Sequence, residues 1–320
     1  MKDEIEFPET LHEAIKYFAD GDRAFDYMKS VRWPSGKVSC PRCGCEEVSF
    51  ISTRKIWTCK KCVTKKQFTI RVGTILEDSA ISFDKWICAF WLIANAKNGV
   101  SSYEIGRALG VTQKTGWFML QRIRLAMQNG TIEKLKGEVE ADETYIGGKV
   151  RNMHVDRKRK RGRGTGGVGK AIVMGLLERK GKIKLKHVAN AKRSTVQGEI
   201  RQHVAPGTHI FTDALPSYNG LNKEFVHEAI DHAKEYVRGN VHTNGLENFW
   251  CLLKRCFKGT YVSVEPFHLF RYLDEQAFRF NEREDTDKGR FTKAISNIIG
   301  KRLTYAELIG KTAQAAELPA

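Results

Sequence analysis

The sequence of 320 residues lacks any apolar run long enough to cross a membrane. The longest apolar stretch near a tryptophan, residues 87–96, is about half the ~20 residues that a transmembrane helix requires. This stretch therefore predicts a buried helix. The N-terminal sequence MKDEIEF also lacks the basic and then apolar pattern of a secretory leader. We therefore expect a cytoplasmic protein with no membrane partner.

The sequence has fewer acidic than basic residues. It contains 37 Asp and Glu and 54 Lys and Arg, which gives a formal net charge of +17. The excess is concentrated in two segments. Residues 37–71 carry nine Lys or Arg and two Glu, and residues 149–170 carry nine Lys or Arg and one Asp. Two such patches predict contact with a polyanion such as DNA. Solvated basic loops are the alternative interpretation.

Two cysteine pairs, CPRC and CKKC, are separated by fifteen residues in segment 37–72. This spacing is typical of a zinc ribbon, in which four thiolates close a tetrahedral structural site. The predicted ligands are Cys40, Cys43, Cys59 and Cys62. A disulfide framework is disfavoured in a reducing cytoplasm. Cys45 could replace Cys43. Residues 1–36 before the ribbon predict a helical lead-in.

Residues 80–130 contain SSYEIGRALGVTQKTGWFMLQRIR, which has the pattern of a helix-turn-helix. Ser101 can cap the first helix, Gly110 can take the positive φ of the tight turn, and Thr112 can cap the second helix. The segment predicts either a DNA-binding motif or a purely structural helical hairpin. In the first case, the side chains expected to face solvent and to contact bases or phosphates are Gln113, Lys114 and Gln121.

Short strands and turns dominate residues 137–283, and a helical tail is expected over 284–320. Strands are predicted at 138–146, 171–178, 182–189, 208–212 and 225–230, with helices near 193–203 and 244–257. This order predicts an α/β, RNase H-like domain with helices on both faces of a mixed sheet. The Gly-rich basic segment 149–170 is expected to be a loop that contacts DNA phosphates through Arg157, Lys158, Arg159, Lys160, Arg161 and Arg163.

Three acidic residues stand where a two-metal site would need them. Asp142 is expected at the end of the first strand, and Asp213 follows an apolar run that should form a neighbouring parallel strand. Glu247 lies thirty-four residues beyond Asp213 in a predicted helix. Carboxylates in this order could hold two Mg²⁺ (or Mn²⁺) ions for phosphoryl transfer. Lys254, two helical turns after Glu247, could hold a DNA phosphate.

Each acid also has a simpler explanation. Asp142 could belong to an exposed acidic set with Glu138 and Glu140, because all three share one face of the strand. Asp213 could cap a turn. Glu247 could be the third residue of a capping box that begins at Asn244.

Taken together, the motifs resemble an insertion-sequence transposase of the IS1595 family, with an ISXO2-like DDE domain. The resemblance rests on CPRCG and CKKC, the EIGRALGVTQKT segment, DETYIGGK, TDALPSY and HTNGLENFWCLLKR. It implies a recombinase with an RNase H-like core that cuts transposon ends and joins their 3′-hydroxyls to target DNA with a divalent metal. It also implies that Asp142 and Asp213 are the first two catalytic acids.

The third metal-site residue in this resemblance is either Asn244 or Glu247. We favour Glu247, because an anionic oxygen binds Mg²⁺ better than an amide does. Glu143 is a lesser rival to Asp142, and strand alternation should point the two side chains in opposite directions.

The function predicted from the sequence is that of a DNA transposase whose partners are double-stranded transposon ends and target DNA. Because two ends must be held at once, a homodimer or higher assembly is expected, although no coiled coil specifies it. A zinc-ribbon transcription regulator without catalysis and an RNase H-like nuclease are the alternatives.

Overall fold

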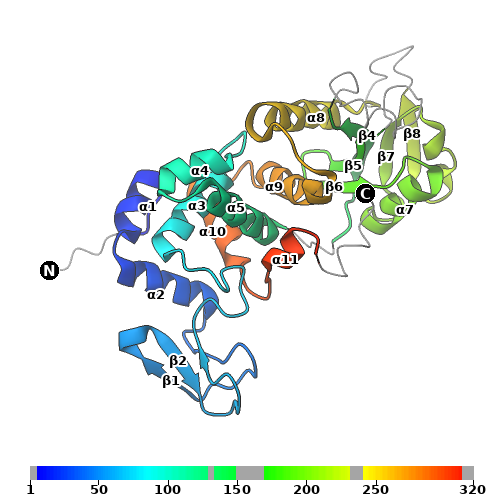
Figure 1. Cartoon of the computed structure of the whole chain (residues 1–320). Coiled ribbons are helices and arrows are strands. Elements are labelled where there is room, and N and C mark those ends of the chain that lie inside the picture. Colours follow the sequence, from blue (N-terminus) through cyan, green and yellow to red (C-terminus); the bar gives the residue numbers. More distant parts are fainter. Residues whose placement is uncertain (1–5, 129–132, 149–168, 231–240, 312–320) are drawn as a thin grey trace. The chain divides into compact units, whose positions relative to one another are not determined.

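The computed structural model describes residues 6–128, 133–148, 169–230 and 241–311. The chain divides into two compact units. Unit 1 comprises residues 1–128 with 284–312, and unit 2 comprises residues 129–283 with 313–320. Residues 284–311 therefore return to the N-terminal unit, so two segments that are far apart in the sequence contribute to one core. Figure 1 labels most of the helices and strands of both units.

Helix α3 (Phe83–Asn95) forms the centre of unit 1. It is buried on most sides, because α1 (Leu11–Phe18), α2 (Gly21–Arg32) and α10 (Asp287–Ser296) all pack against it. The predicted buried helix is thus confirmed. Among the described residues, no helix combines the length and the apolarity that a membrane crossing needs.

A small three-stranded antiparallel sheet carries the cysteine pairs. Its strands are β1 (Val48–Ile51), β2 (Ile56–Cys59) and β3 (Gln67–Phe68), and the 3₁₀ turn η1 (Ser52–Arg54) joins the first two. Trp57 of β2 stacks between Phe68 and Phe25 of α2, with ring centroids 5.9 Å away in each case. The lead-in helices and the ribbon therefore share an aromatic core.

The predicted pair of helices forms as α4 (Ser102–Leu109) and α5 (Gln113–Met127). Ser101 caps α4 in a capping box, Gly110 takes a φ of 60° after α4, and Thr112 caps α5. The prediction that Gln121 faces solvent is wrong, because its exposure is 0%. Helix α5 packs mainly on α4 and also contacts α3 and α10, the last of which comes from the far end of the chain. The short helix α11 (Tyr305–Leu308) completes unit 1.

Unit 2 is built on a five-stranded mixed sheet with the order β6-β5-β4-β7-β8. Strands β4, β5 and β6 pair antiparallel, whereas β4, β7 and β8 pair parallel. The predicted strands are confirmed to within about a residue at each end. Their bounds are β4 (Glu138–Ile146), β5 (Ala171–Glu178), β6 (Ile183–Val188), β7 (His209–Asp213) and β8 (Val226–Ile230).

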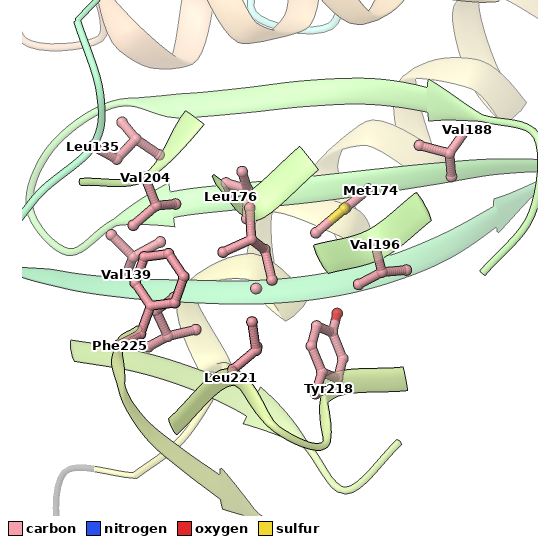
Figure 2. Packing of buried hydrophobic residues seen from close by; sticks show 13 residues of the cluster. Leu135, Val139, Met174, Leu176, Val188, Val196, Val204, Tyr218, Leu221 and Phe225 are labelled. Carbon is pink, nitrogen blue, oxygen red and sulfur yellow. The ribbon is translucent and has the colours of Figure 1, made fainter. Parts of the chain in front are cut away.

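Helices cover both faces of this sheet, as predicted. Helix α7 (Arg193–His203) packs one face, where Val196 meets Met174, Leu176 and Tyr218 (Figure 2). Helices α8 (Asn244–Cys256) and α9 (Leu269–Asn281) pack the other face. Short turns complete the unit: η3 (Pro216–Tyr218), η4 (Leu221–Lys223), a π-helical turn (Phe257–Tyr261) and η6 (Pro266–His268).

Candidate metal centres and nucleic-acid interface

The four predicted zinc ligands come together in the ribbon. The Sγ atoms of Cys40, Cys43, Cys59 and Cys62 all lie within 4.8 Å of one another, and none of the chain's eight cysteines forms a disulfide. Four thiolates at this spacing have the donor set of a structural zinc site. Cys45 is not part of the group, because its Sγ instead accepts a hydrogen bond from the Glu47 amide at 3.4 Å.

The first two acids lie side by side on parallel strands. In the pairing of β4 with β7, Ala141 is opposite Thr212, so the next positions along the two strands are Asp142 and Asp213. Neighbouring strands run about 4.8 Å apart. Asp142 lies in the middle of β4 and not at its end, because β4 continues beside β5 after β7 has ended at Asp213. The two acids therefore mark the carboxyl end of the parallel pairing, where ligands of α/β sheets bind.

Both carboxylate oxygens of Asp142 are held in place. Oδ2 accepts a hydrogen bond from Trp250 Nε1 of α8 at 2.8 Å, and Oδ1 accepts one from the Glu143 amide at 2.8 Å. The indole fits because Gly175 lies opposite Asp142 on β5. A Cβ at Gly175 would come within 2.6 Å of the Trp250 ring. No pattern in the sequence indicates this hydrogen bond between Trp250 and Asp142.

The acids influence one another electrostatically. Burial raises the pKa of Asp142 to about 6, the indole bond from Trp250 opposes that rise, and the negative charges of Asp213 and Glu247 add to it. Burial and neighbouring negative charges make the ionised form of Asp142 less favourable in free energy than it would be in water. A bound cation would remove that cost, so the residues fit a divalent metal site.

Helix α8 presents the remaining candidates. Its N-cap is Thr243, so Asn244 is already the first helical residue, and the capping box that would begin at Asn244 is not formed. Asn244, Glu247 and Lys254 are all exposed. Thr243 Oγ1 lies 3.5 Å from Glu247 Oε1, to which it donates. Because the N-cap of α8 is Thr243, the prediction that Glu247 is the third residue of a capping box begun by Asn244 is wrong.

Of the simpler explanations for Asp142 and Asp213, the structure contradicts the first and supports the second. The exposed acidic set does not exist, because Glu140 is 1% exposed. The turn explanation of Asp213 holds, since its Oδ1 accepts a hydrogen bond from the Leu215 amide at 3.3 Å. A carboxylate that accepts one such bond keeps further lone pairs for a metal ion.

Glu143 lies on the opposite face of β4, as strand alternation predicts. Asp142 meets Trp250 on the α8 face, whereas Glu143 lies near Tyr218. Tyr218 belongs to the hydrophobic core on the α7 face of the sheet and is labelled in Figure 2. Burial raises the pKa of Glu143 to about 7, the Tyr218 hydroxyl opposes the rise, and the negative charges of Asp142 and Asp213 add to it. Glu143 therefore points away from the face of β4 that carries Asp142.

Two family models match this chain. The model described as ISXO2-like transposase domain covers residues 134–281, and the transposase zinc-ribbon domain of the same family covers residues 19–65. The chain belongs to the IS1595 family of transposases. The ribbon match begins within the lead-in, in agreement with the aromatic core that joins α2 to the ribbon strands.

Two proteins with similar sequences have descriptions that refer to a transposable element or a transposase. Over 258 residues the chain is 29% identical to an "Uncharacterized protein in transposable element ISH50" of Halobacterium salinarum, covering 75% of this chain and 84% of the relative. Over 98 residues it is 33% identical to an "Uncharacterized transposase-like protein" of Haemophilus influenzae, covering 30% of this chain and 79% of the relative.

Of the three residues of α5 that were predicted to contact DNA, two are exposed and one is buried. Gln113 is exposed and its Nε2 donates to Ser102 Oγ at 2.8 Å, so it also ties α5 to α4. Lys114 is exposed and its Nζ lies 5.5 Å from the centre of the Tyr305 ring. Buried Gln121 cannot reach DNA. The predicted phosphate contacts of segment 149–170 fall on residues 157–163, which lie outside the described residues.

Proposed function

We propose that this family member is a DNA transposase that cuts transposon ends and joins their 3′-hydroxyls to target DNA. The observation that carries the proposal is the adjacency of Asp142 and Asp213 on parallel strands, with the charge of Glu247 acting on Asp142. The sheet order and strand directions support an RNase H-like assignment for unit 2, because three antiparallel strands followed by two parallel ones are the arrangement expected of that fold.

Asp142, Asp213 and Glu247 would hold divalent metal, with Glu247 preferred over Asn244 because of its charge. When bound, such metal ions lower the pKa of the attacking water or hydroxyl and stabilise the leaving oxygen. Trp250 orients Asp142 toward the site through its indole N–H. Lys254, two turns along α8 from Glu247, would hold a backbone phosphate as a point charge.

DNA recognition is assigned to the basic parts of the chain. The ribbon and the first turn of α5 would bind the terminal repeats, and segment 149–170 would bind phosphates. Replacing the Arg and Lys residues of 157–163 with neutral residues should flatten the salt dependence of DNA binding. An unchanged slope would remove segment 149–170 from the interface. Because two ends are joined to one target, the active species would be a dimer or larger.

The test is an assay of end cleavage and strand joining with purified protein, Mg²⁺ and DNA that carries the element's ends. Asp142→Asn and Asp213→Asn keep the side-chain shape and should reduce both steps by at least about a thousandfold, as expected when a ligand of catalytic metal is lost. Glu228→Gln, an exposed acid of β8, is the matched control and should have no effect. Wild-type rates in both aspartate variants would refute the proposal. Cleavage without joining would instead indicate a nuclease.

A further inference from the structure

A buried ion pair lies on the α8 face of the sheet, beside the three acids. Glu140 of β4 is 1% exposed, and its Oε1 accepts a hydrogen bond from Arg179 Nε at 3.1 Å. Arg179 comes from the turn between β5 and β6. The proposed chemistry uses neither residue. A buried charge costs free energy unless it is fully paired, so the presence of this pair calls for an explanation.

The pair is linked to the start of α8. The second carboxylate oxygen of Glu140 accepts a hydrogen bond from the Leu246 amide at 2.9 Å. Leu246 is in the first turn of α8, where amides have no partner within the helix and where the helix dipole favours a negative charge. Arg179 Nη2 donates to the His242 carbonyl at 2.9 Å, just before the helix. Both members of the pair therefore hold the N-terminus of α8.

The same pair also touches the third element of the site. The Arg179 guanidinium carbon lies 4.1 Å from the centre of the Phe211 ring on β7. Each contact residue is one or two positions from a proposed metal ligand. Glu140 precedes Asp142 on β4, Phe211 precedes Asp213 on β7, and Leu246 precedes Glu247 on α8. One ion pair thus joins all three elements that carry the acids.

Gly245 shows how closely the helix approaches Glu140. A Cβ at this position would lie 2.8 Å from Glu140 Oε2 and 2.8 Å from Leu177 Cδ2. The N-terminus of α8 is therefore seated directly on the carboxylate. A larger residue would push the helix start, and Glu247 with it, away from β4.

We propose that Glu140 and Arg179 are positioning residues, which fix the N-terminus of α8 so that Glu247 stands at a set place relative to Asp142 and Asp213. This inference rests on the proposed function, because it assigns a purpose to the place of Glu247. A buried ion pair adds little net stability, since desolvation offsets most of its attraction. The pair instead restricts where its neighbours can lie, because a carboxylate and a guanidinium form good hydrogen bonds in only a few relative orientations.

The first test measures the position of α8 without any reaction. Hydrogen exchange followed by mass spectrometry on the full chain reports the protection of amides 244–248. Glu140→Gln keeps the size of the side chain but removes its charge, and we expect those amides to exchange about tenfold faster, with α9 unchanged. Glu138→Gln is the matched control. Glu138 lies on the same face of β4 and its Oε2 is 3.6 Å from Arg179 Nη1, but its side chain is 47% exposed, and it should leave exchange unchanged.

The second test separates positioning from general stability. In the cleavage assay, Glu140→Gln should raise the Mg²⁺ concentration for half-maximal rate about tenfold, while the rate at saturating Mg²⁺ changes less. Faster exchange with an unchanged Mg²⁺ dependence would overturn the positioning role and leave a structural one. Unchanged exchange would also overturn it. Full activity of Asp142→Asn would refute the proposed function instead, so the two failures are distinguishable.

A charge-balanced variant covers the case in which a single substitution prevents folding. Arg179→Gln leaves Glu140 buried and negative near Asp142, so its effects should exceed those of Glu140→Gln. The double variant Glu140→Gln/Arg179→Gln removes both charges and should exchange more slowly at amides 244–248 than Arg179→Gln alone. Additive effects in the double variant would show that the two residues do not act as a pair, and would overturn the proposal.

Discussion

The cysteine cluster of unit 1 and the acid centre of unit 2 are both suited to metal ions, but the chain assembles them in opposite ways. The cysteines occur as two pairs, each with two residues between its members, and their sulfur atoms lie within 4.8 Å of one another. The acids come from two strands and a helix, and no compact group of three of them satisfies the same spacing among the described residues. A two-metal site does not require such compactness, since its ions stand about 3.5 to 4 Å apart and share the ligands.

The two centres also differ in what they do to stability. A structural zinc ion closes the ribbon and contributes to its folding. The acid centre, in contrast, places Asp142 where burial and like charge raise its pKa. The first centre is therefore expected to stabilise its unit and the second to destabilise its unit.

The largest effect is expected from Cys59→Ser. Cys59 is buried at 0% exposure, and structural zinc contributes on the order of 10 kcal/mol to small domains. We expect loss of bound zinc, measured by elemental analysis, and unfolding of the ribbon. Cys45→Ser is the control, because Cys45 lies outside the cluster, and it should retain one zinc per chain. Zinc retained in Cys59→Ser would contradict the four-thiolate site.

The next effect distinguishes the two candidates for the third metal ligand. Glu247→Gln should lower the strand-cleavage rate at least a hundredfold, or about 2.7 kcal/mol of transition-state stabilisation. Asn244→Ala should lower it less than tenfold, since Asn244 carries no charge. The measurement is single-turnover cleavage in Mg²⁺. The reverse order of the two effects would make Asn244 the ligand.

The pH dependence of stability tests the strain at Asp142. Its ordinary pKa of 3.8 is raised to about 6, and that of Glu143 from 4.5 to about 7. The folded state thus binds more protons than the unfolded state, so stability should fall as the pH rises from about 4 to 7. Asp142→Asn should flatten this fall and stabilise unit 2 at pH 8 by on the order of 2 kcal/mol.

Thermal or urea unfolding in Mg²⁺-free buffer, without a chelator that would remove zinc, measures this difference. The control is Asp213→Glu at the same pH values, which preserves the charge and should retain the slope. An Asp142→Asn variant that loses stability at pH 8 would show that this carboxylate is favourably placed even without metal.

The smallest effect is expected at Lys254. Lys254→Ala removes one exposed positive charge from α8 and should weaken binding of end DNA severalfold while reducing the slope of log K against log salt by about one. Lys223→Ala, at the end of η4, serves as the control for general charge. Equal effects of the two substitutions would mean that Lys254 does not contact a phosphate.

Local signals account for most of what the sequence predicted correctly. The CxxC turns, the positive φ of Gly110 and the alternation over 138–146 are all determined by neighbours in the chain. The errors come from distant segments. Gln121 is buried on α5, a helix that packs against α3, α4 and α10, and α10 comes from the far end of the sequence. Asp142 is mid-strand because β5, not β7, sets the length of β4. The burial of Glu140 depends on Arg179, which arrives from a turn that no local pattern connects to it.

Binding of Mn²⁺ measured by electron paramagnetic resonance tests the central claim most directly. The full chain, with its zinc in place and with end DNA bound, is titrated with Mn²⁺ beside the Asp213→Asn variant. The proposal that Asp142, Asp213 and Glu247 hold the metal predicts that wild-type protein removes free Mn²⁺ from solution at concentrations at least tenfold lower than the variant requires. Superimposable titration curves for the two proteins would contradict it.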